Sequence, residues 1–140
     1  ASDAELIAIH DGARPFVSQA LLEEVISTAA QCHAAAPAVQ VKDTIKRAVK
    51  GQVIDTPDRR ELFAVQTPQV FEASLIRAAI QKALDDKAVL TDDCSAVERL
   101  GMTVCLTKGA YENLKITTPS DLLFGEQLIL SGKENGGETE

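Results

Sequence analysis

The sequence lacks the features of a membrane-spanning or exported protein. It contains no apolar run near the roughly 20 residues that a helix needs to cross a bilayer. Its first residues do not combine positive charge with an apolar stretch, as a signal peptide does. We therefore expect a soluble protein of the cytoplasm, with no membrane partner.

Cysteine is scarce, and its spacing forms no recognisable pair. The three cysteines, Cys32, Cys94 and Cys105, are odd in number and far apart, and the sequence has no C-x-x-C. This spacing indicates neither a disulfide framework nor a structural zinc site. Such cysteine usage favours a reducing compartment.

Basic residues are in the minority, and several common catalytic motifs are missing. The 14 Lys and Arg residues and 21 Asp and Glu residues give a net charge of -7. Such a charge repels nucleic acid unless the Lys and Arg side chains gather on one face. Nucleic acid is therefore not an expected partner. The sequence has no G-x-x-x-x-G-K-S/T loop, G-x-S-x-G elbow or H-E-x-x-H, so P-loop and hydrolase assignments have no support.

The sequence does contain the alternation of strands and helices that is typical of an α/β domain. Its 140 residues, 45% of them hydrophobic, are enough for one core. Residues 6–9 form an apolar run that predicts a buried strand, and residues 38–41 predict a second. Between them, Ser18 as N-cap and the apolar spacing of residues 21–29 predict an amphipathic helix. This order predicts a right-handed parallel crossover.

Residues 43–55 predict a β-hairpin with little core of its own. β-type residues flank Lys50 and Gly51, and charges lie on both faces. An isolated two-stranded hairpin is marginal in water. We therefore expect residues 41–60 to form a protruding arm that lies on a partner subunit.

The remainder of the chain predicts two more strands and three helices. The strands are residues 62–66 and 103–107, and the helices cover residues 73–84, 91–101 and 118–130. Thr91 is the expected N-cap of the middle helix, and Thr118, Pro119 and Asp121 open the last one as N-cap, first-turn proline and capping acid. Residues 132–140 carry no apolar side chain and predict a disordered tail.

The loop after the first strand is the foremost candidate site, because open α/β sheets bind ligands where their strands end. In residues 10–15, the Asp11 carboxylate suits a hard divalent cation such as Mg²⁺, and the Arg14 guanidinium suits phosphate. The alternative is that these residues only form a turn, and His10 is interpreted as structural. Taken on spacing alone, the charges of the hairpin read as a solvated face, Thr91 as a helix cap and Lys115 as a loop lysine.

Five segments in order resemble the 2-C-methyl-D-erythritol 4-phosphate cytidylyltransferase family. They are residues 9–16 (IHDGARPF), 42–46 (KDTIK), 66–71 (QTPQVF), 91–98 (TDDCSAVE) and 113–119 (NLKITTP). The resemblance implies a Rossmann-like, mostly parallel sheet with flanking helices, in a homodimer whose hairpin arms interlock. It also implies a nucleotidyltransferase that makes a cytidine diphosphate alcohol from CTP in the non-mevalonate isoprenoid route.

The resemblance assigns roles residue by residue. It makes Asp11 the Mg²⁺ ligand and Arg14 and Lys115 the cations beside the nucleotide and acceptor phosphates. Gly12 and Ala13 become nucleotide-binding, although the family often has Ala at the position of Gly12. The resemblance also implies that the hydroxyls of Thr67 and Thr91 donate to the erythritol phosphate. It implies that Thr44 and Arg59 reach across the dimer to the partner's substrate. Those substrate-binding residues are Thr44, Arg59, Thr67 and Thr91.

The resemblance covers only the later part of the family's pattern. The Gly-rich loop that holds the CTP triphosphate in the family has no match in these 140 residues, so residues 1–131 correspond to a carboxyl-terminal portion. We therefore expect the chain to be inactive by itself. Two alternatives remain: a related enzyme that uses ribitol 5-phosphate as acceptor, and a noncatalytic dimerisation fragment.

Overall fold

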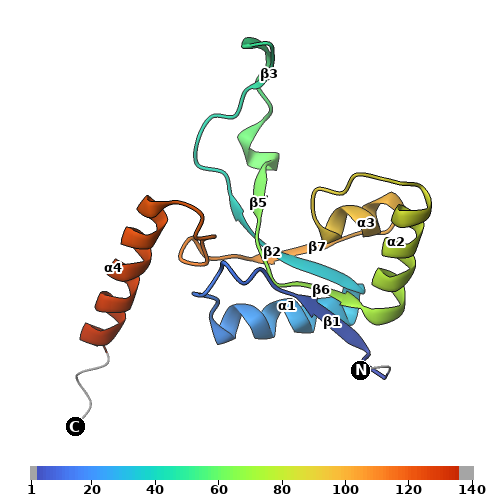
Figure 1. The fold of residues 1–140 in the computed structure, drawn as a ribbon, viewed down its shortest axis with the longest axis horizontal. Coiled ribbons are helices and arrows are strands. Elements are labelled where there is room, and N and C mark those ends of the chain that lie inside the picture. Colours follow the sequence, from blue (N-terminus) through green and yellow to red (C-terminus); the bar gives the residue numbers. More distant parts are fainter. Residues whose placement is uncertain (1–2, 136–140) are drawn as a thin grey trace.

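The computed structural model describes residues 3–135, with side chains up to residue 132, and contains a five-stranded sheet (Figure 1). Strands β1 (Leu6–Ile9), β6 (Gln69–Glu72), β2 (Ala34–Gln40) and β5 (Phe63–Val65) lie in this order. Strand β7 (Cys105–Lys108) pairs with β2 in parallel. The other three pairings are antiparallel, so β1, β2 and β7 run one way and β5 and β6 run the other.

The predicted α/β, Rossmann-like class is confirmed, but the sheet, which was expected to be mostly parallel, is mixed, with one parallel and three antiparallel pairings. The first two strands run in the same direction with a helix between them, as expected, but β6 lies between them in the sheet. Sequence analysis missed β6, since it is only four residues long and follows Pro68 directly. It also began β2 at residue 38, whereas the strand begins at Ala34.

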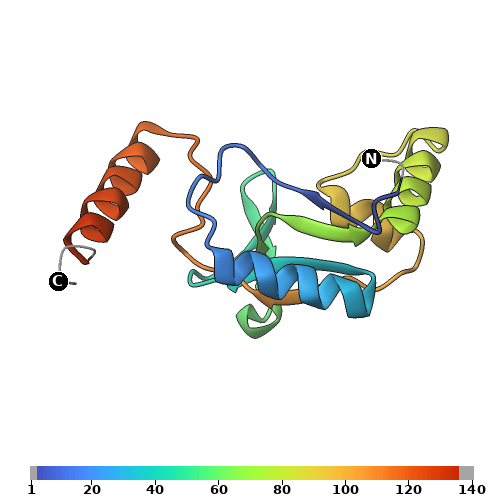
Figure 2. The same cartoon turned by 90° about the horizontal axis from the view of Figure 1, so that it is seen from below.

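Helices cover both faces of this sheet (Figure 2). Helix α1 (Gln19–Cys32) buries Val25 and Ala29 against Ala35 and Val70, while the neighbouring Ala34, Ala36 and Phe71 pack on the opposite side. Successive side chains of a strand point to opposite faces, so these two sets belong to two layers. The second layer is formed by α2 (Ala73–Asp85) and α3 (Asp93–Arg99).

The helix starts follow local hydrogen bonding. Ser18 caps α1, as predicted, by accepting from the Leu21 N–H at 3.2 Å. The prediction of Thr91 as the cap of α3 is wrong: Asp92 is the N-cap, and it forms a reciprocal capping box with Ser95. A carboxylate accepts a backbone N–H more strongly than a hydroxyl does, which explains the one-residue difference.

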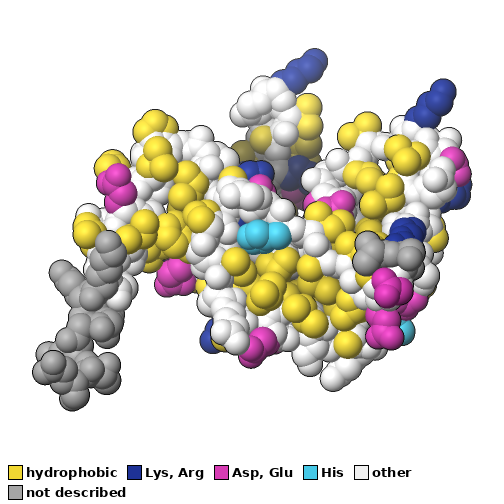
Figure 3. All heavy atoms as spheres, turned by 60° about the horizontal axis from the view of Figure 1, so that its bottom comes forward, with side chains coloured by type: hydrophobic (Ala, Val, Ile, Leu, Met, Phe, Trp, Pro, Cys, Tyr) yellow, Lys and Arg dark blue, Asp and Glu magenta, His cyan; other side chains and the backbone are white. Residues whose placement is uncertain are grey.

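Helix α4 (Pro119–Asn135) stands beside the sheet rather than over it (Figures 1 and 2). Thr118 and Asp121 exchange hydrogen bonds at its start, as the predicted cap requires. The helix continues through residues 132–135, where a disordered tail was expected, and the rest of that predicted tail, 136–140, lies outside the described residues. Figure 3 shows hydrophobic side chains along this helix and over the adjoining face of the body.

The hairpin arm projects away from the body, as predicted (Figure 1). Strands β3 (Arg47–Val49) and β4 (Gln52–Asp55) are joined by Lys50 and Gly51, whose φ angles of 49° and 79° are those of a two-residue hairpin turn. The short 3-10 helix η1 (Arg59–Glu61) leads from the arm back to β5. Within residues 3–135, no helix is both long enough and apolar enough to cross a membrane.

Candidate active site

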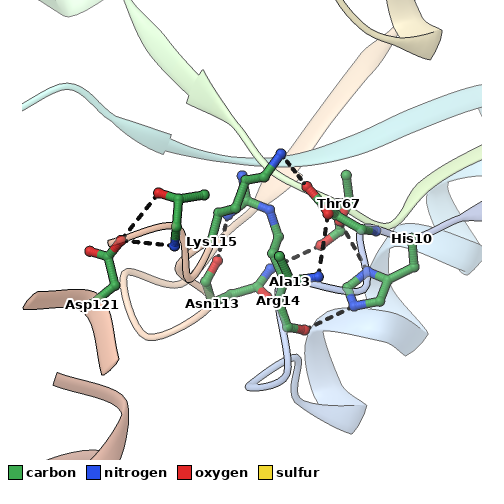
Figure 4. A network of polar contacts seen from close by, with 9 residues as sticks. His10, Ala13, Arg14, Thr67, Asn113, Lys115 and Asp121 are labelled. Carbon is green, nitrogen blue, oxygen red and sulfur yellow. Dashed lines mark hydrogen bonds and ion pairs between the residues drawn. The ribbon is translucent and has the colours of Figure 1, made fainter. Parts of the chain in front are cut away.

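Three loops meet at one edge of the sheet (Figure 4). Strands β1 and β7 end at this edge because both run parallel to β2, and the antiparallel β6 begins there. The loops are residues 10–15, 66–68 and 109–118. This is the place where α/β sheets gather ligand-binding side chains.

Asp11 and Lys115 form an ion pair across two of these loops, with 2.8 Å between Oδ2 and Nζ. The other carboxylate oxygen accepts the Ala13 N–H at 3.3 Å. The pKa of Asp11 lies below its ordinary value because of the hydrogen bond from Lys115, then that from Ala13, with Arg14 adding a smaller effect. The Asp11 side chain is 28% exposed and that of Lys115 is 50% exposed, so a solvent-borne ligand can reach both.

Arg14 lies against the same pair from within the first loop. Its Nη1 donates to the Asn113 carbonyl at 2.7 Å, and its own N–H donates to the Asp11 carbonyl at 2.9 Å. Burial lowers the pKa of Arg14 from its ordinary value, while the Asp11 charge acts in the opposite direction. A guanidinium stays charged through such a change, so the site keeps two cations around one carboxylate.

Thr67 and His10 hold the first loop in place. The Thr67 hydroxyl accepts the Asp11 N–H at 3.0 Å and lies 3.0 Å from His10 Nδ1, and His10 Nε2 lies 3.0 Å from the Arg14 carbonyl. Because a carbonyl only accepts, Nε2 carries the proton and the Thr67 hydroxyl donates to Nδ1. These contacts are those of a residue that holds the loop, as the structural interpretation of His10 expects.

The structure brings together some of the predicted site residues and leaves others apart. Asp11, Arg14, Thr67 and Lys115 meet, with Gly12 and Ala13 in the same loop. By contrast, Arg59 donates to the Lys42 carbonyl at 2.6 Å within the arm, and the Thr91 N–H donates to Ser95. Within residues 3–135, neither they nor Thr44 hydrogen-bond to Asp11, Arg14 or Lys115.

Sequence analysis did not single out two buried amides beneath these loops, Gln66 and Asn113. Each lay inside a segment that carries the family resemblance. A polar residue in a loop normally faces water, so nothing in the sequence alone indicates that these two are buried.

The residues at this rim fit a metal ion that takes most of its ligands from the substrate and from water, and few from the protein. Within residues 3–135, no group of three His, Cys, Asp or Glu side chains could form a complete metal site. Mg²⁺ commonly uses one or two protein carboxylates, with phosphate oxygens and water completing its shell. Asp11 offers one such carboxylate at the rim, and it already accepts one cation there, the Lys115 ammonium.

Comparison with known proteins is consistent with this arrangement. The model of the family described as 2-C-methyl-D-erythritol 4-phosphate cytidylyltransferase matches residues 1–131. The chain belongs to this family. A 2-C-methyl-D-erythritol 4-phosphate cytidylyltransferase of Halalkalibacterium halodurans is 52% identical over 129 residues, and one of Caldanaerobacter subterraneus is 53% identical over 128.

The match covers part of each family member. The first match spans 92% of this chain and 56% of the Halalkalibacterium halodurans cytidylyltransferase. The second spans 91% of this chain and 56% of the Caldanaerobacter subterraneus cytidylyltransferase. The crystal structure of the Thermus thermophilus cytidylyltransferase has a TM-score of 0.82 and 36% identity, covering 90% of this chain and 62% of that one. The crystal structure of the Anaerococcus prevotii 4-diphosphocytidyl-2C-methyl-D-erythritol synthase has a TM-score of 0.84 and 35% identity. The match covers 91% of this chain and 57% of that one. The chain thus spans about half the length of its curated relatives.

Proposed function

We propose that this chain supplies the phosphate-binding rim of an enzyme that transfers a cytidylyl group from CTP to 2-C-methyl-D-erythritol 4-phosphate and releases pyrophosphate. The convergence of Arg14 and Lys115 on the Asp11 carboxylate carries the proposal. The reaction belongs to the non-mevalonate route to isoprenoids. The cytoplasm is its proposed compartment, which the three free cysteines support.

The chemistry requires charge neutralisation more than proton transfer. A phosphate monoester has a second pKa of about 6, so the acceptor is already a nucleophilic dianion at neutral pH. One of its oxygens bonds to the α-phosphorus of CTP, and the bond from that phosphorus to the pyrophosphate oxygen breaks. Both reactants are anions, so the barrier is dominated by their repulsion and by the charge that develops on the leaving group.

Arg14 and Lys115 provide the opposing charge. The Lys115 ammonium pairs with the Asp11 carboxylate, and the Asn113 carbonyl holds the Arg14 guanidinium close enough for its charge to act on the same carboxylate. A dianionic phosphate that displaces Asp11 from Lys115 would leave the carboxylate free for Mg²⁺. When bound, Mg²⁺ would supply further neutralisation of the phosphate oxygens.

The remaining proposed contacts complete the substrate sites. The Gly12 amide faces the nucleotide beside Ala13, whose own N–H already holds Asp11. The Thr91 hydroxyl donates to the acceptor, and the Thr67 hydroxyl does so by turning its proton from His10 Nδ1 toward the phosphate. Thr44 and Arg59 bind the substrate of a partner subunit. The arm supports this homodimer, since Val53 exposes 60% of its surface on a hairpin that projects from the body.

A chimera tests the proposal. Residues 1–131 replace the matching segment of the Halalkalibacterium halodurans relative, so that the other part of the enzyme comes from a protein 52% identical over 129 residues. We expect pyrophosphate release with CTP, Mg²⁺ and 2-C-methyl-D-erythritol 4-phosphate. A folded chimera that releases none would contradict the function.

Two parallel assays separate the alternatives. Replacing the acceptor by ribitol 5-phosphate in the chimera should abolish turnover, and preference for ribitol 5-phosphate would identify the related activity instead. The 140-residue chain alone should release little or no pyrophosphate, because its sequence has no Gly-rich triphosphate loop. Dimerisation of a chain whose chimera is inactive would favour a noncatalytic dimerisation module.

A further inference from the structure

Two buried side-chain amides lie beneath the cluster of Asp11, Arg14 and Lys115. Asn113 is 0% exposed and Gln66 is 5% exposed. The Asn113 side chain donates from Nδ2 to the Thr67 carbonyl at 2.9 Å and to Gln66 Oε1 at 3.3 Å. Gln66 in turn donates to the Ala110 carbonyl at 2.7 Å and accepts the Ala110 N–H at 3.2 Å. The two amides therefore join the loop before β6 to the loop after β7.

The backbone of Asn113 extends this connection to the first loop. Its carbonyl accepts from Arg14 Nη1 at 2.7 Å, so the side chain fixes the group that receives the guanidinium. Just beyond it, Lys115 pairs with Asp11, and the Ile116 N–H donates to the Ala13 carbonyl at 2.8 Å. Asn113 thus contacts both of the other loops, through its side chain to Thr67 and through its carbonyl to Arg14 (Figure 4).

We propose that Asn113 is a positioning residue that sets Arg14 and Lys115 relative to Asp11, with Gln66 as its anchor. The catalytic consequence rests on the proposed function, because only cytidylyl transfer gives the two cations a reacting phosphate to meet. Misplacement of such groups by about 1 Å can lower a rate roughly 100-fold.

The unsatisfied polar atoms in this region support a positioning role over simple packing. Asn113 Oδ1 and Arg14 Nε are buried and have no hydrogen-bond partner among the described residues. Burying polar atoms without partners is unfavourable, and an apolar side chain at either position would avoid the penalty. The remaining polar atoms of the two side chains make hydrogen bonds that orient the loops: Asn113 Nδ2 to Thr67 and Gln66, and Arg14 Nη1 to the Asn113 carbonyl.

The test compares Asn113→Ala with Ile76→Ala. Ile76 is buried between α2 and the sheet, so its truncation lowers stability while leaving every hydrogen bond of the three loops in place. Hydrogen exchange followed by NMR on the 140-residue chain reports the Ile116 amide and the Arg14 Nε–H. We expect both to exchange at least tenfold faster in Asn113→Ala than in Ile76→Ala.

The same variants in the chimera give a second measurement. Asn113→Ala should lower kcat about 10- to 100-fold with a much smaller change in the KM for CTP, because the cations are misplaced rather than removed. Ile76→Ala should keep kcat within about threefold of the unsubstituted chimera at a temperature where both are folded. Equal kcat values, or equal exchange rates, for the two variants would overturn the positioning role.

A third variant keeps the test decisive if Asn113→Ala does not fold. Gln66→Met keeps the volume of the side chain and removes its hydrogen bonds to Ala110 and Asn113, so the Ala110 amide should lose protection. If neither loop variant folds, the Asn113 side-chain NH₂ of the unsubstituted chain decides: slow exchange supports the proposal, and exchange at the solvent rate overturns it. A chimera without turnover would defeat the proposed function, and the exchange data would still judge the positioning.

Discussion

The Lys115 ammonium lies 2.8 Å from the Asp11 carboxylate, although one residue follows the first strand of the sheet and the other follows the last. Both side chains remain partly exposed, and under the proposed function Lys115 exchanges Asp11 for a phosphate while Asp11 exchanges Lys115 for a metal ion.

The pKa of Asp11 should rise in Lys115→Met. Lys115 is the largest cause of its lowering from 3.8, so removing the ammonium leaves only the Ala13 N–H and Arg14 to favour the charged form. Because the folded pKa is the lower one, the stabilisation from this pair is present above the unfolded value of 3.8 and is lost as the pH falls through the folded value. An NMR titration of the Asp11 carboxyl carbon measures the change.

Lys82→Met is the matched control for this titration. It removes a second Lys–Asp ion pair, with Asp86 at 2.6 Å on the surface of α2. The control should raise the pKa of Asp86 and leave that of Asp11 unchanged. An Asp11 pKa that does not move in Lys115→Met would show that the ion pair does not persist in solution.

Turnover of the chimera should fall by about 100- to 1,000-fold in Asp11→Asn and in Lys115→Ala. Each variant removes a full charge from the rim where the reacting phosphates are proposed to meet, and neither leaves a buried cavity. Circular dichroism should therefore show an intact fold. Asp86→Asn removes an ion-paired carboxylate at the C-cap of α2 and should keep full activity. Near-normal turnover in Asp11→Asn would refute the proposed role.

Gly109→Ala should destabilise the chain by about 1–3 kcal/mol, since an added Cβ must be accommodated by shifts in its surroundings. That Cβ would lie 2.8 Å from the carbonyl carbon and oxygen of Ala38 and from Gln66 Oε1. Gly12→Ala is the comparison, because nothing lies within 4 Å of its added Cβ. Urea unfolding of the two variants should give clearly different midpoints, and equal midpoints would contradict the close packing of Gly109.

Val53→Lys should shift the chain from dimer toward monomer in sedimentation experiments. Val53 is 60% exposed on the arm that is proposed to contact the partner, and a buried lysine charge there would be unfavourable. Val89→Lys alters a valine that is 96% exposed outside the arm and should not change the assembly. A dimer of equal strength in both variants would place the interface elsewhere.

Cys94 should resist alkylation in the folded chain. Burial, assisted by the neighbouring carboxylates of Asp92, Glu98 and Asp93, raises the pKa of its thiol to about 12. At pH 8 only about one thiol in ten thousand would then be ionised, and the thiolate is the reactive form. Mass spectrometry after iodoacetamide treatment should find Cys94 unmodified until denaturant is added, and rapid modification in the native chain would contradict its burial.

Sequence reasoning located elements best where a local signal specifies them. Ser18 and Thr118 cap their helices through hydrogen bonds made within a few residues, and the Lys50–Gly51 turn requires positive φ angles, which the sequence itself signals. The strand β6 carries no such signal. Its place between β1 and β2 depends on pairing with residues far away in the chain, which periodicity cannot reveal.

Prediction of the site followed the same division. Residue type suggested a cation-binding carboxylate at Asp11 and a phosphate-binding guanidinium at Arg14, whereas Lys115 entered the predicted site only through the family resemblance. The burial of Gln66 and Asn113 could not be inferred from the sequence, because the same amides in an exposed loop would be hydrated and would hold no other loop in place.

The sequence by itself determined the helix caps at Ser18 and Thr118, the hairpin turn, the kind of charge at each loop and membership of the family, because these depend on residue identity and near neighbours. Only the tertiary structure decided that β6 separates two parallel strands and that three distant loops share one rim around Asp11. That convergence depends on long-range strand pairing and on hydrogen bonds between Gln66, Asn113 and Arg14, whose energies exist only once the chain is folded.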